Sequence, residues 1–206
     1  MTDGAGSIRT IVLDLNGVYF NIGVDVAKPV LCRMTGCTMD EWNSALSAAG
    51  AQDYMGGRIT AAEFWRGMSA ALHFDMRMAR RLQIAVNDAY RPTAGMPELA
   101  IRLGKDYRMV AFSGIARELF LHLDLTYRLH GVFDDFLLSY RARCSKDSSS
   151  FYRMLLGKIK CRPQECVYVD DKAENLGMAG PLGIRTALFR SVPELRRQLA
   201  AGGVRL

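Results

Sequence analysis

The stretch that decides the fold is Ile11-Val12-Leu13-Asp14-Leu15-Asn16-Gly17-Val18. Its apolar first half predicts a strand that is covered on both faces, and its second half predicts a turn at Gly17. Asp14 therefore stands where the strand ends. Ligands of open α/β sheets bind just beyond the carboxyl ends of the strands, so Asp14 is a candidate nucleophile or metal ligand. Taken alone, a turn or helix-capping aspartate explains the pattern equally well.

Other apolar or β-branched runs predict further strands, with helical patterns between most of them. The five predicted strands are Ile8–Leu15, Met109–Phe112, Phe136–Ser139, Cys166–Asp170 and Thr186–Phe189. Alternating strands and helices predict an α/β fold, here a Rossmann-like three-layer core with a largely parallel sheet. From about Asn21 to Tyr90 the pattern is helical throughout, which breaks the alternation and indicates an insert.

Capping boxes mark three of the predicted helix starts. They pair Thr38 with Glu41, Thr60 with Glu63 and Ser191 with Glu194. The first two predict amphipathic helices in the insert, joined by Gly56-Gly57. Aromatic side chains of the insert are expected in its core rather than in a substrate wall, namely Trp42, Tyr54 and Trp65. Residues 1–6 are expected to fray.

Composition narrows the class of protein. The chain has 206 residues, half of them hydrophobic, and a formal charge of +6, which favours an anionic ligand. We find neither a long apolar run nor a secretory leader, so we expect a soluble cytoplasmic protein without a membrane partner. No nucleic-acid motif accompanies the basic residues, so a nucleic-acid partner is disfavoured. The five scattered cysteines indicate reduced thiols, with a Cys32–Cys37 redox pair as the less favoured alternative.

A second chemical signal closes the strand Cys166–Asp170. It ends in the adjacent carboxylates Asp170 and Asp171, which repel one another unless a cation is present. Oxygen ligands of this kind suit Mg²⁺. Asn175, four residues on, is placed to hold the loop, and a solvated acidic turn is the simpler alternative.

Two more strand ends add a hydroxyl group and a cation. Ser113 closes one strand, and its hydroxyl with the following N–H groups, from Gly114 onward, could bind phosphate at a helix start. Lys146 follows another strand and could neutralise a phosphate or hold a carboxylate. Four such signals, in this order at the ends of parallel strands, predict one site.

Together these residues resemble the motifs of the haloacid dehalogenase-like (HAD) superfamily, in the branch with an α-helical cap after the first motif. The matching segments are Asp14-Leu15-Asn16-Gly17-Val18, Ser113, Lys146-Asp147 with Phe151-Tyr152, Val169-Asp170-Asp171 with Asn175, and the run 179–184. The similarity extends from Arg9 to Phe189 and includes a cap-like segment, residues 57–64. It implies an α/β core of residues 1–18 and 91–206 and a helical cap of residues 19–90.

The resemblance also implies a chemistry. Asp14 would attack phosphorus to form an aspartyl-phosphate. The side chains of Asp14 and Asp171 and the main-chain carbonyl of Asn16 would hold Mg²⁺, with Asp170 as a further candidate. Ser113, Gly114 and Lys146 would bind the phosphoryl oxygens of a small, anionic, phosphorylated substrate.

Asn16 departs from the family's pattern, because phosphatases place a second aspartate there as general acid and base. An amide can do neither job, and such assistance is worth about 10²- to 10⁴-fold in rate. Three hypotheses follow: a Mg²⁺-dependent phosphohydrolase or phosphotransferase with impaired acid–base help, a metal-free dehalogenase-like hydrolase acting on carbon, and a non-catalytic binding protein. We favour the first, because Asp14, Ser113, Lys146 and Asp171 are all kept. The pair Asp170-Asp171 argues against the second, and Asn16 is the main support for the third.

Overall fold

The computed structural model describes residues 7–206, whose five strands form one parallel sheet. The strands are β1 (Thr10–Leu13), β2 (Arg108–Ser113), β3 (Asp135–Leu138), β4 (Cys166–Asp170) and β5 (Arg185–Leu188), in the order β3-β2-β1-β4-β5. The expected α/β fold is confirmed. β1 is the central strand and is shorter than the predicted Ile8–Leu15, because its pairing with β2 and β4 covers only Thr10–Leu13.

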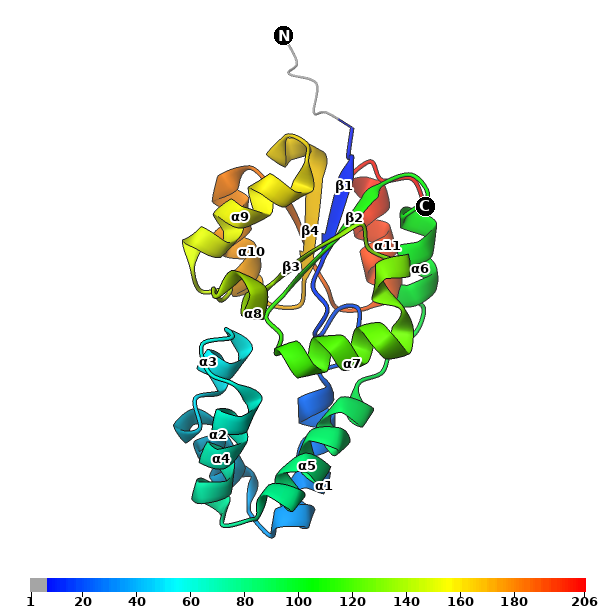
Figure 1. Ribbon diagram of the computed structural model, residues 1–206. Helices are drawn as coiled ribbons and strands as arrows, with labels where there is room; N and C mark the ends of the chain where they lie inside the picture. The colour runs from blue at the N-terminus through cyan, green and yellow to red at the C-terminus, as the bar shows by residue number, and fades with distance from the viewer. Residues whose placement is uncertain (1–6) are drawn as a thin grey trace.

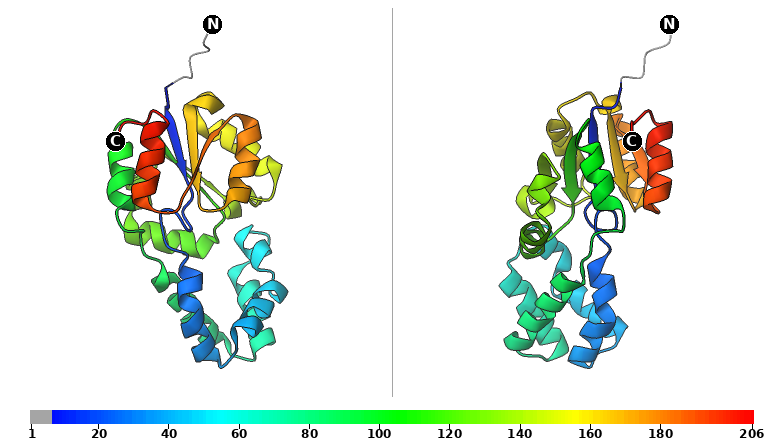
Figure 2. Two further views of the ribbon diagram at one scale, coloured as in Figure 1. Left: turned by 180° about the vertical axis from the view of Figure 1, so that it is seen from behind. Right: turned by 90° about the vertical axis from the view of Figure 1, so that its right-hand side faces the viewer.

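Helices cover both faces of the sheet (Figure 2). Ile11 and Leu13 of β1 belong to one hydrophobic cluster, to which α6 (Met96–Leu103), α7 (Arg117–Tyr127) and α11 (Val192–Ala201) contribute. Val12 points to the opposite face, where α9 (Ser149–Ile159) and α10 (Ala173–Ala179) supply the second cluster. Successive residues of a strand face opposite sides, so a continuously apolar strand serves both layers. A short helix, α8 (Ser139–Ala142), follows β3.

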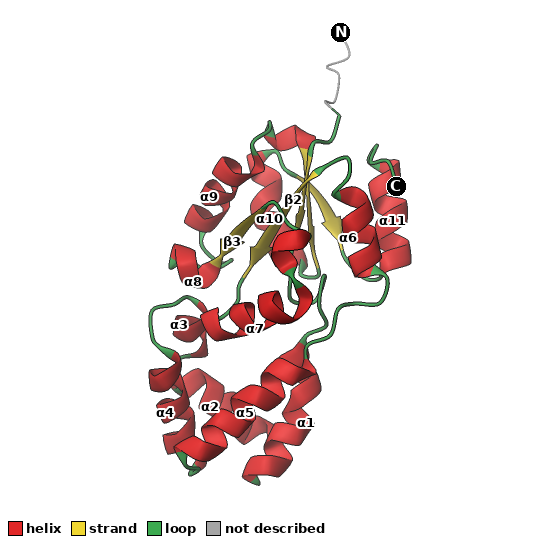
Figure 3. Cartoon of the chain, turned by 45° about the vertical axis from the view of Figure 1, so that its right-hand side comes forward, coloured by secondary structure: helices red, strands yellow, loops and turns green. Residues whose placement is uncertain are grey.

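The remaining helices form a separate unit below the sheet (Figures 1 and 3). They are α1 (Gly23–Thr35), α2 (Met39–Ala48), α3 (Ala51–Met55), α4 (Ala61–Leu72) and α5 (Met76–Ala89). This helical unit, residues 23–89, has its own hydrophobic cluster, in which Trp42 and Trp65 are buried as expected. Two segments connect this unit to the core, and hydrogen bonds between Asn21 and Arg91 hold them together. The Asn21 N–H donates to the Arg91 carbonyl, and the Arg91 N–H donates to Asn21 Oδ1.

The predicted helix starts are found with one correction. Thr38 and Thr60 form complete capping boxes with Glu41 and Glu63. Ser191 accepts a hydrogen bond from the main-chain N–H of Glu194, but within residues 7–206 the reciprocal bond is not found. The Glu194 carboxylate instead accepts a hydrogen bond from Gln198 Nε2, one turn further along α11. Gly56-Gly57 follows α3, a short helix that the sequence did not predict.

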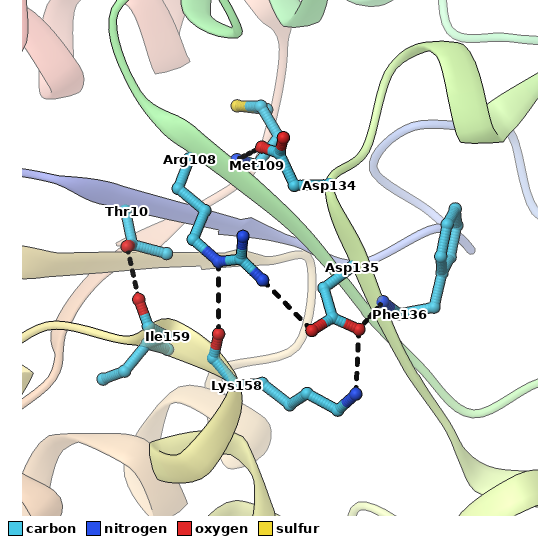
Figure 4. Close-up of polar contacts among 8 residues, drawn as sticks. All are labelled: Thr10, Arg108, Met109, Asp134, Asp135, Phe136, Lys158 and Ile159. Carbon is cyan, nitrogen blue, oxygen red and sulfur yellow. Dashed lines mark hydrogen bonds and ion pairs between the residues drawn. The ribbon is translucent and has the colours of Figure 1, made fainter.

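Polar contacts tie the edge strand β3 to its neighbours (Figure 4). Arg108 Nη2 at the start of β2 lies 3.1 Å from Asp135 Oδ2, and Lys158 Nζ of α9 lies 2.8 Å from Asp135 Oδ1. Asp134 Oδ2 accepts a hydrogen bond of 2.8 Å from the N–H of Met109. Two carboxylates and two cations therefore fix the position where β3 begins.

Further expectations concern the cysteines, membrane-spanning helices and residues 1–6. The five cysteines are free thiols. Within residues 7–206 we find no helix that is long and apolar enough to cross a membrane. The expected fraying of residues 1–6 lies outside the described residues.

Candidate active site

Three neighbouring parallel strands place predicted polar residues at their carboxyl ends, on one side of the sheet. Asp14 follows β1 directly, Ser113 ends β2, and Asp170 ends β4 with Asp171 after it. The main-chain N–H of Asp14 still donates to the Val169 carbonyl, 3.0 Å away, so the ends of β1 and β4 stay in register. Parallel pairing thus brings together acids that are about 155 residues apart in the sequence.

Lys146 bridges two of these acids. Its Nζ lies 2.7 Å from Asp14 Oδ2 and 2.7 Å from Asp170 Oδ2. The ammonium group also lies over the rings of Phe112 and Tyr168, with centroid distances of 5.2 and 5.6 Å. The expected ion pair between Lys146 and the strand-end acids is therefore present, and two aromatic faces add to it.

Asp170 is more completely bonded than the sequence analysis expected. It is fully buried, and its Oδ1 accepts hydrogen bonds of 2.9 Å from Lys172 N–H and from Asn175 Nδ2. Its Oδ2 accepts from Lys146 Nζ and from the Tyr168 hydroxyl. Asn175 thus holds the loop, as expected. The Asp170 carboxylate is occupied in positioning Lys146, which leaves it less available to a metal than Asp14 and Asp171.

Asp14 and Asp171 each have a buried carboxylate oxygen without a hydrogen-bond partner among the described residues. Asp14 Oδ1 and Asp171 Oδ1 are buried and make no hydrogen bond with any described residue. One oxygen from each of Asp14, Asp170 and Asp171 lies within 4.8 Å of the others. Gly17 permits this approach: it has φ +81°, and a Cβ at this position would lie 2.5 Å from Asp171 Oδ2.

Burial and charge shift the pKa values of the three acids in different directions. Burial raises the pKa of Asp14 to about 6, although Lys146 opposes the rise. Burial and the neighbouring Asp170 raise the pKa of Asp171. Burial also acts on Asp170, but the charge and hydrogen bond of Lys146, together with hydrogen bonds from Tyr168 and Asn175, outweigh it and lower that pKa. Asp170 is therefore the acid whose negative charge its neighbours compensate most fully.

Asn16 lies beside Asp14 and is fixed by one hydrogen bond. Its Nδ2 donates to the Gly114 carbonyl, 3.0 Å away at the end of the neighbouring strand. Its Oδ1 is buried and has no hydrogen-bond partner among the described residues. The amide thus joins the first two predicted motifs but offers no titratable proton.

A cavity of about 350 Å³ opens beside these groups, between the core and the helical unit. Asp14, Asn16, Gly114, Lys146 and Asp171 line it. Ser113 and Asp170, both completely buried, are not among its lining residues. The Ser113 hydroxyl makes no hydrogen bond of ordinary geometry with a described residue, but it lies close enough to Asp14 to help lower the pKa of that carboxyl. The structure therefore brings all the predicted site residues to one end of the sheet and places two of them behind the cavity wall.

Sequence reasoning missed several residues of this site. Tyr168 bonds to Asp170, and its position two residues earlier on the same strand could have indicated a shared face. Ile22, Met55 and Tyr90 line the cavity from the other side, and their apolar character carried no signal of a site.

The fold is that of HAD-family enzymes. A HAD-family enzyme from Bacteroides thetaiotaomicron superposes with a TM-score of 0.78 at 19% identity, covering 94% of this chain and 99% of that one. A HAD-like family hydrolase from Porphyromonas gingivalis has a TM-score of 0.75 at 20% identity, covering 94% and 98%. The L-2-haloacid dehalogenase from Xanthobacter autotrophicus has a TM-score of 0.65 at 16% identity, covering 97% and 85%.

Comparison by sequence is less specific. No family model matches the chain. A drimenol cyclase from Aspergillus calidoustus is 22% identical over 198 residues, which are 93% of this chain and 36% of the cyclase. The chain thus spans about a third of the length of that relative.

Proposed function

We propose that this protein is a Mg²⁺-dependent hydrolase that transfers a phosphoryl group to Asp14 and then to water. The observation that carries the proposal is the arrangement around Asp14: a buried carboxylate with one unpartnered oxygen, paired with Lys146, beside the acid Asp171 and at the wall of a cavity. A nucleophilic carboxylate that reacts with a phosphate needs an accessible oxygen and neighbouring groups that stabilise the negative charge of the phosphate.

The residues present fit a Mg²⁺ ion. Asp14 Oδ1 and Asp171 Oδ1 are buried oxygens without partners, and oxygen is the ligand that Mg²⁺ prefers. The main-chain carbonyl of Asn16 would be a further ligand, and Asp170 would act through Lys146. Bound there, Mg²⁺ would offset the repulsion between an ionised Asp14 and an anionic phosphate. The structure of the Bacteroides enzyme in complex with magnesium and inorganic phosphate supports this assignment.

In the reaction, a carboxylate oxygen of Asp14 attacks phosphorus, and the bond to the leaving oxygen breaks with its electron pair on that oxygen. Lys146 and the N–H groups around Gly114 hold the phosphoryl oxygens, while the Ser113 hydroxyl, buried behind the cavity wall, acts on the Asp14 carboxylate. Water then attacks phosphorus, the bond to Asp14 breaks with its electron pair returning to the carboxylate, and both protons of the water leave with the inorganic phosphate. Asn16 cannot protonate the leaving group, so the site suits phosphates whose leaving group is already a weak base.

We further propose that the helical unit acts as a cap. The cavity lies where α3 and the two connecting segments meet the core, and α3 is joined to the core by a hydrogen bond of 2.6 Å from Ser139 Oγ to the Met55 carbonyl. A closed cap would exclude bulk water from the reacting groups.

Acetyl phosphate tests the proposal, because its leaving group needs no proton. We expect release of phosphate that depends on Mg²⁺ and falls by at least about 10³-fold in Asp14→Asn. Asp106→Asn, an exposed change of the same kind, is the matched control. Equal release from the Asp14 variant would refute the proposed nucleophile. No release by a folded wild-type protein with Mg²⁺ would favour the non-catalytic binding hypothesis, whose main support is Asn16.

A further inference from the structure

The two walls of the cavity differ in chemistry. The core contributes every charged lining residue: Asp14, Lys146, Asp147, Asp171 and Lys172. The opposite wall, from the helical unit and its connecting segments, consists of Ile22, Val24, Gln52, Met55, Gly56 and Tyr90. Burial raises the pKa of Tyr90 to about 12, so its phenol is neutral at pH 7. A phosphate placed against the core therefore directs its organic group toward an uncharged wall.

This uncharged wall is held in place by packing and hydrogen bonds. Tyr90 is 4% exposed, and its ring packs against the Cα of Gly23 so closely that a Cβ there would overlap it. The Tyr90 carbonyl accepts a hydrogen bond of 3.1 Å from the Tyr127 hydroxyl. The Met55 carbonyl, in the same wall, accepts a hydrogen bond from Ser139 Oγ of the core. The wall is thus formed before a ligand arrives, which favours selection by shape and polarity.

A charged organic group would lose hydration against this wall without gaining a partner. Burying an unpaired charge or polar group costs free energy, whereas covering the side chains of Ile22 and Met55 is favourable. Gln52 is the single side-chain amide among the lining residues of this wall. A polyhydroxylated group would therefore find few hydrogen-bond partners there.

We propose that the substrate is the phosphate of a compact, uncharged, apolar acyl or aryl group, with Ile22 and Met55 as specificity-determining residues. The proposal deepens the proposed function and rests on it. The two requirements agree: Asn16 calls for a leaving group that needs no protonation, and the opposite wall calls for an apolar one.

Non-hydrolysable phosphonates test this selection without requiring turnover. Calorimetric titration of the whole protein with Mg²⁺ would compare benzylphosphonate, methylphosphonate and the carboxylate-bearing 3-phosphonopropionate. We expect benzylphosphonate to bind at least about tenfold more tightly than either of the others. Equal or tighter binding of 3-phosphonopropionate would overturn the proposal.

A matched pair of variants assigns the selection to the cavity wall. Ile22→Lys places a cation at the cavity, so we expect it to reduce the preference for benzylphosphonate over 3-phosphonopropionate by about tenfold or more. Val26→Lys, one turn along α1, adds the same charge at a side chain that is 58% exposed and does not line the cavity. It should leave the preference unchanged. An equal effect of both variants would assign the selection to net charge and overturn the role of Ile22.

The two proposals fail separately. If acetyl phosphate is hydrolysed but the three phosphonates bind alike, the substrate class is wrong and the reaction stands. If benzylphosphonate binds selectively but acetyl phosphate is inert, the wall selects as proposed and the protein is a binding protein. If no phosphonate binds to the folded protein with Mg²⁺ present, the substrate class is wrong, and if acetyl phosphate is inert as well, both proposals are wrong.

Discussion

At Asn16, one amide decides how much acid–base help the site can give. Its Nδ2 donates to the Gly114 carbonyl, so a carboxylic acid placed here could keep this hydrogen bond through its O–H group. We expect Asn16→Asp to raise turnover of an apolar alkyl phosphate such as butyl phosphate by about 10²-fold or more. The gain for acetyl phosphate should be smaller, since its leaving group is a weak base. Steady-state kinetics on both substrates would measure the difference.

A surface variant provides the control for this comparison. Asn43→Asp introduces the same charge at an exposed position of α2 and should change neither rate. Equal gains for both substrates in Asn16→Asp would show that the new group does not act on the leaving group. If both substrates stay inert in the folded variant with Mg²⁺, the binding hypothesis is the better one.

Asp171 is the residue whose loss should most directly weaken metal binding. Its buried Oδ1 has no protein partner among the described residues, and Asp170 is already occupied by four hydrogen bonds. We expect Asp171→Ala to weaken Mg²⁺ binding by about 10- to 100-fold in calorimetry, because one of two carboxylate ligands is removed. Asp106→Ala, at an exposed position, should bind like the wild type. Unchanged affinity in Asp171→Ala would contradict the assignment.

At the scale of a single element, the edge strand β3 depends on the ion pairs of Asp135 (Figure 4). Asp135→Asn would leave Arg108 and Lys158 without their carboxylate partner. Because all three side chains are partly exposed, we expect a loss of about 1 kcal/mol in the free energy of unfolding at pH 7. Urea denaturation would measure it, with Asp106→Asn as the exposed control. A loss no larger than that of the control would show that the ion pairs do not hold the strand.

The same ion pairs make a prediction for pH. Burial acts to raise the pKa of Asp135, but the hydrogen bond and charge of Lys158, the main-chain N–H of Phe136 and the charge of Arg108 together outweigh it, so the pKa lies below its ordinary value. A lowered pKa in the folded state contributes stability above the pKa of the unfolded chain, near 4, and this is lost as the pH falls through the folded pKa. The difference between wild type and Asp135→Asn should therefore be full at pH 7 and shrink below about pH 4. A difference that grows on acidification would contradict this assignment.

For the molecule as a whole, the helical unit contacts the core through α5, which packs beside α7, and through α3. Ser139 Oγ donates to the Met55 carbonyl, and the Tyr54 hydroxyl donates to Glu118 Oε2, 3.1 Å away. Gly57 lies against the main chain of Tyr140, with a φ of +66°. These contacts lie far along the chain from the connecting segments at residues 20–22 and 90–92, so they close the unit onto the core.

A pair of glycine variants separates docking from local strain. A Cβ on Gly57 would lie 2.5 Å from the Tyr140 carbonyl oxygen, so Gly57→Ala should push α3 off the core. Gly36→Ala imposes a similar strain, at φ +77°, where a Cβ meets nothing within 4 Å. Small-angle X-ray scattering should show a larger maximum dimension for Gly57→Ala only. Identical profiles for the two variants would mean that this contact does not hold the unit closed.

The sequence by itself determined the α/β class, the five strands and the acids at their ends, because hydrophobic periodicity and strand-end position are local properties. Asp14, Lys146 and Asp171 could be selected in this way. Several helix starts followed from capping boxes for the same reason. The first strand came out too long, since its ends depend on how far its partners extend.

Only the tertiary structure decided which of the selected residues bond to one another and which line the cavity. Four hydrogen bonds on Asp170 come from Lys146, Tyr168, Lys172 and Asn175. Spacing predicted a loop role for Asn175, but that all four groups meet at one carboxylate depends on how the strands and loops pack. The cavity wall formed by Ile22, Met55 and Tyr90 also depends on how the helical unit sits against the core. An apolar side chain looks the same in sequence whether it fills a core or faces a ligand, because its role depends on what packs against it.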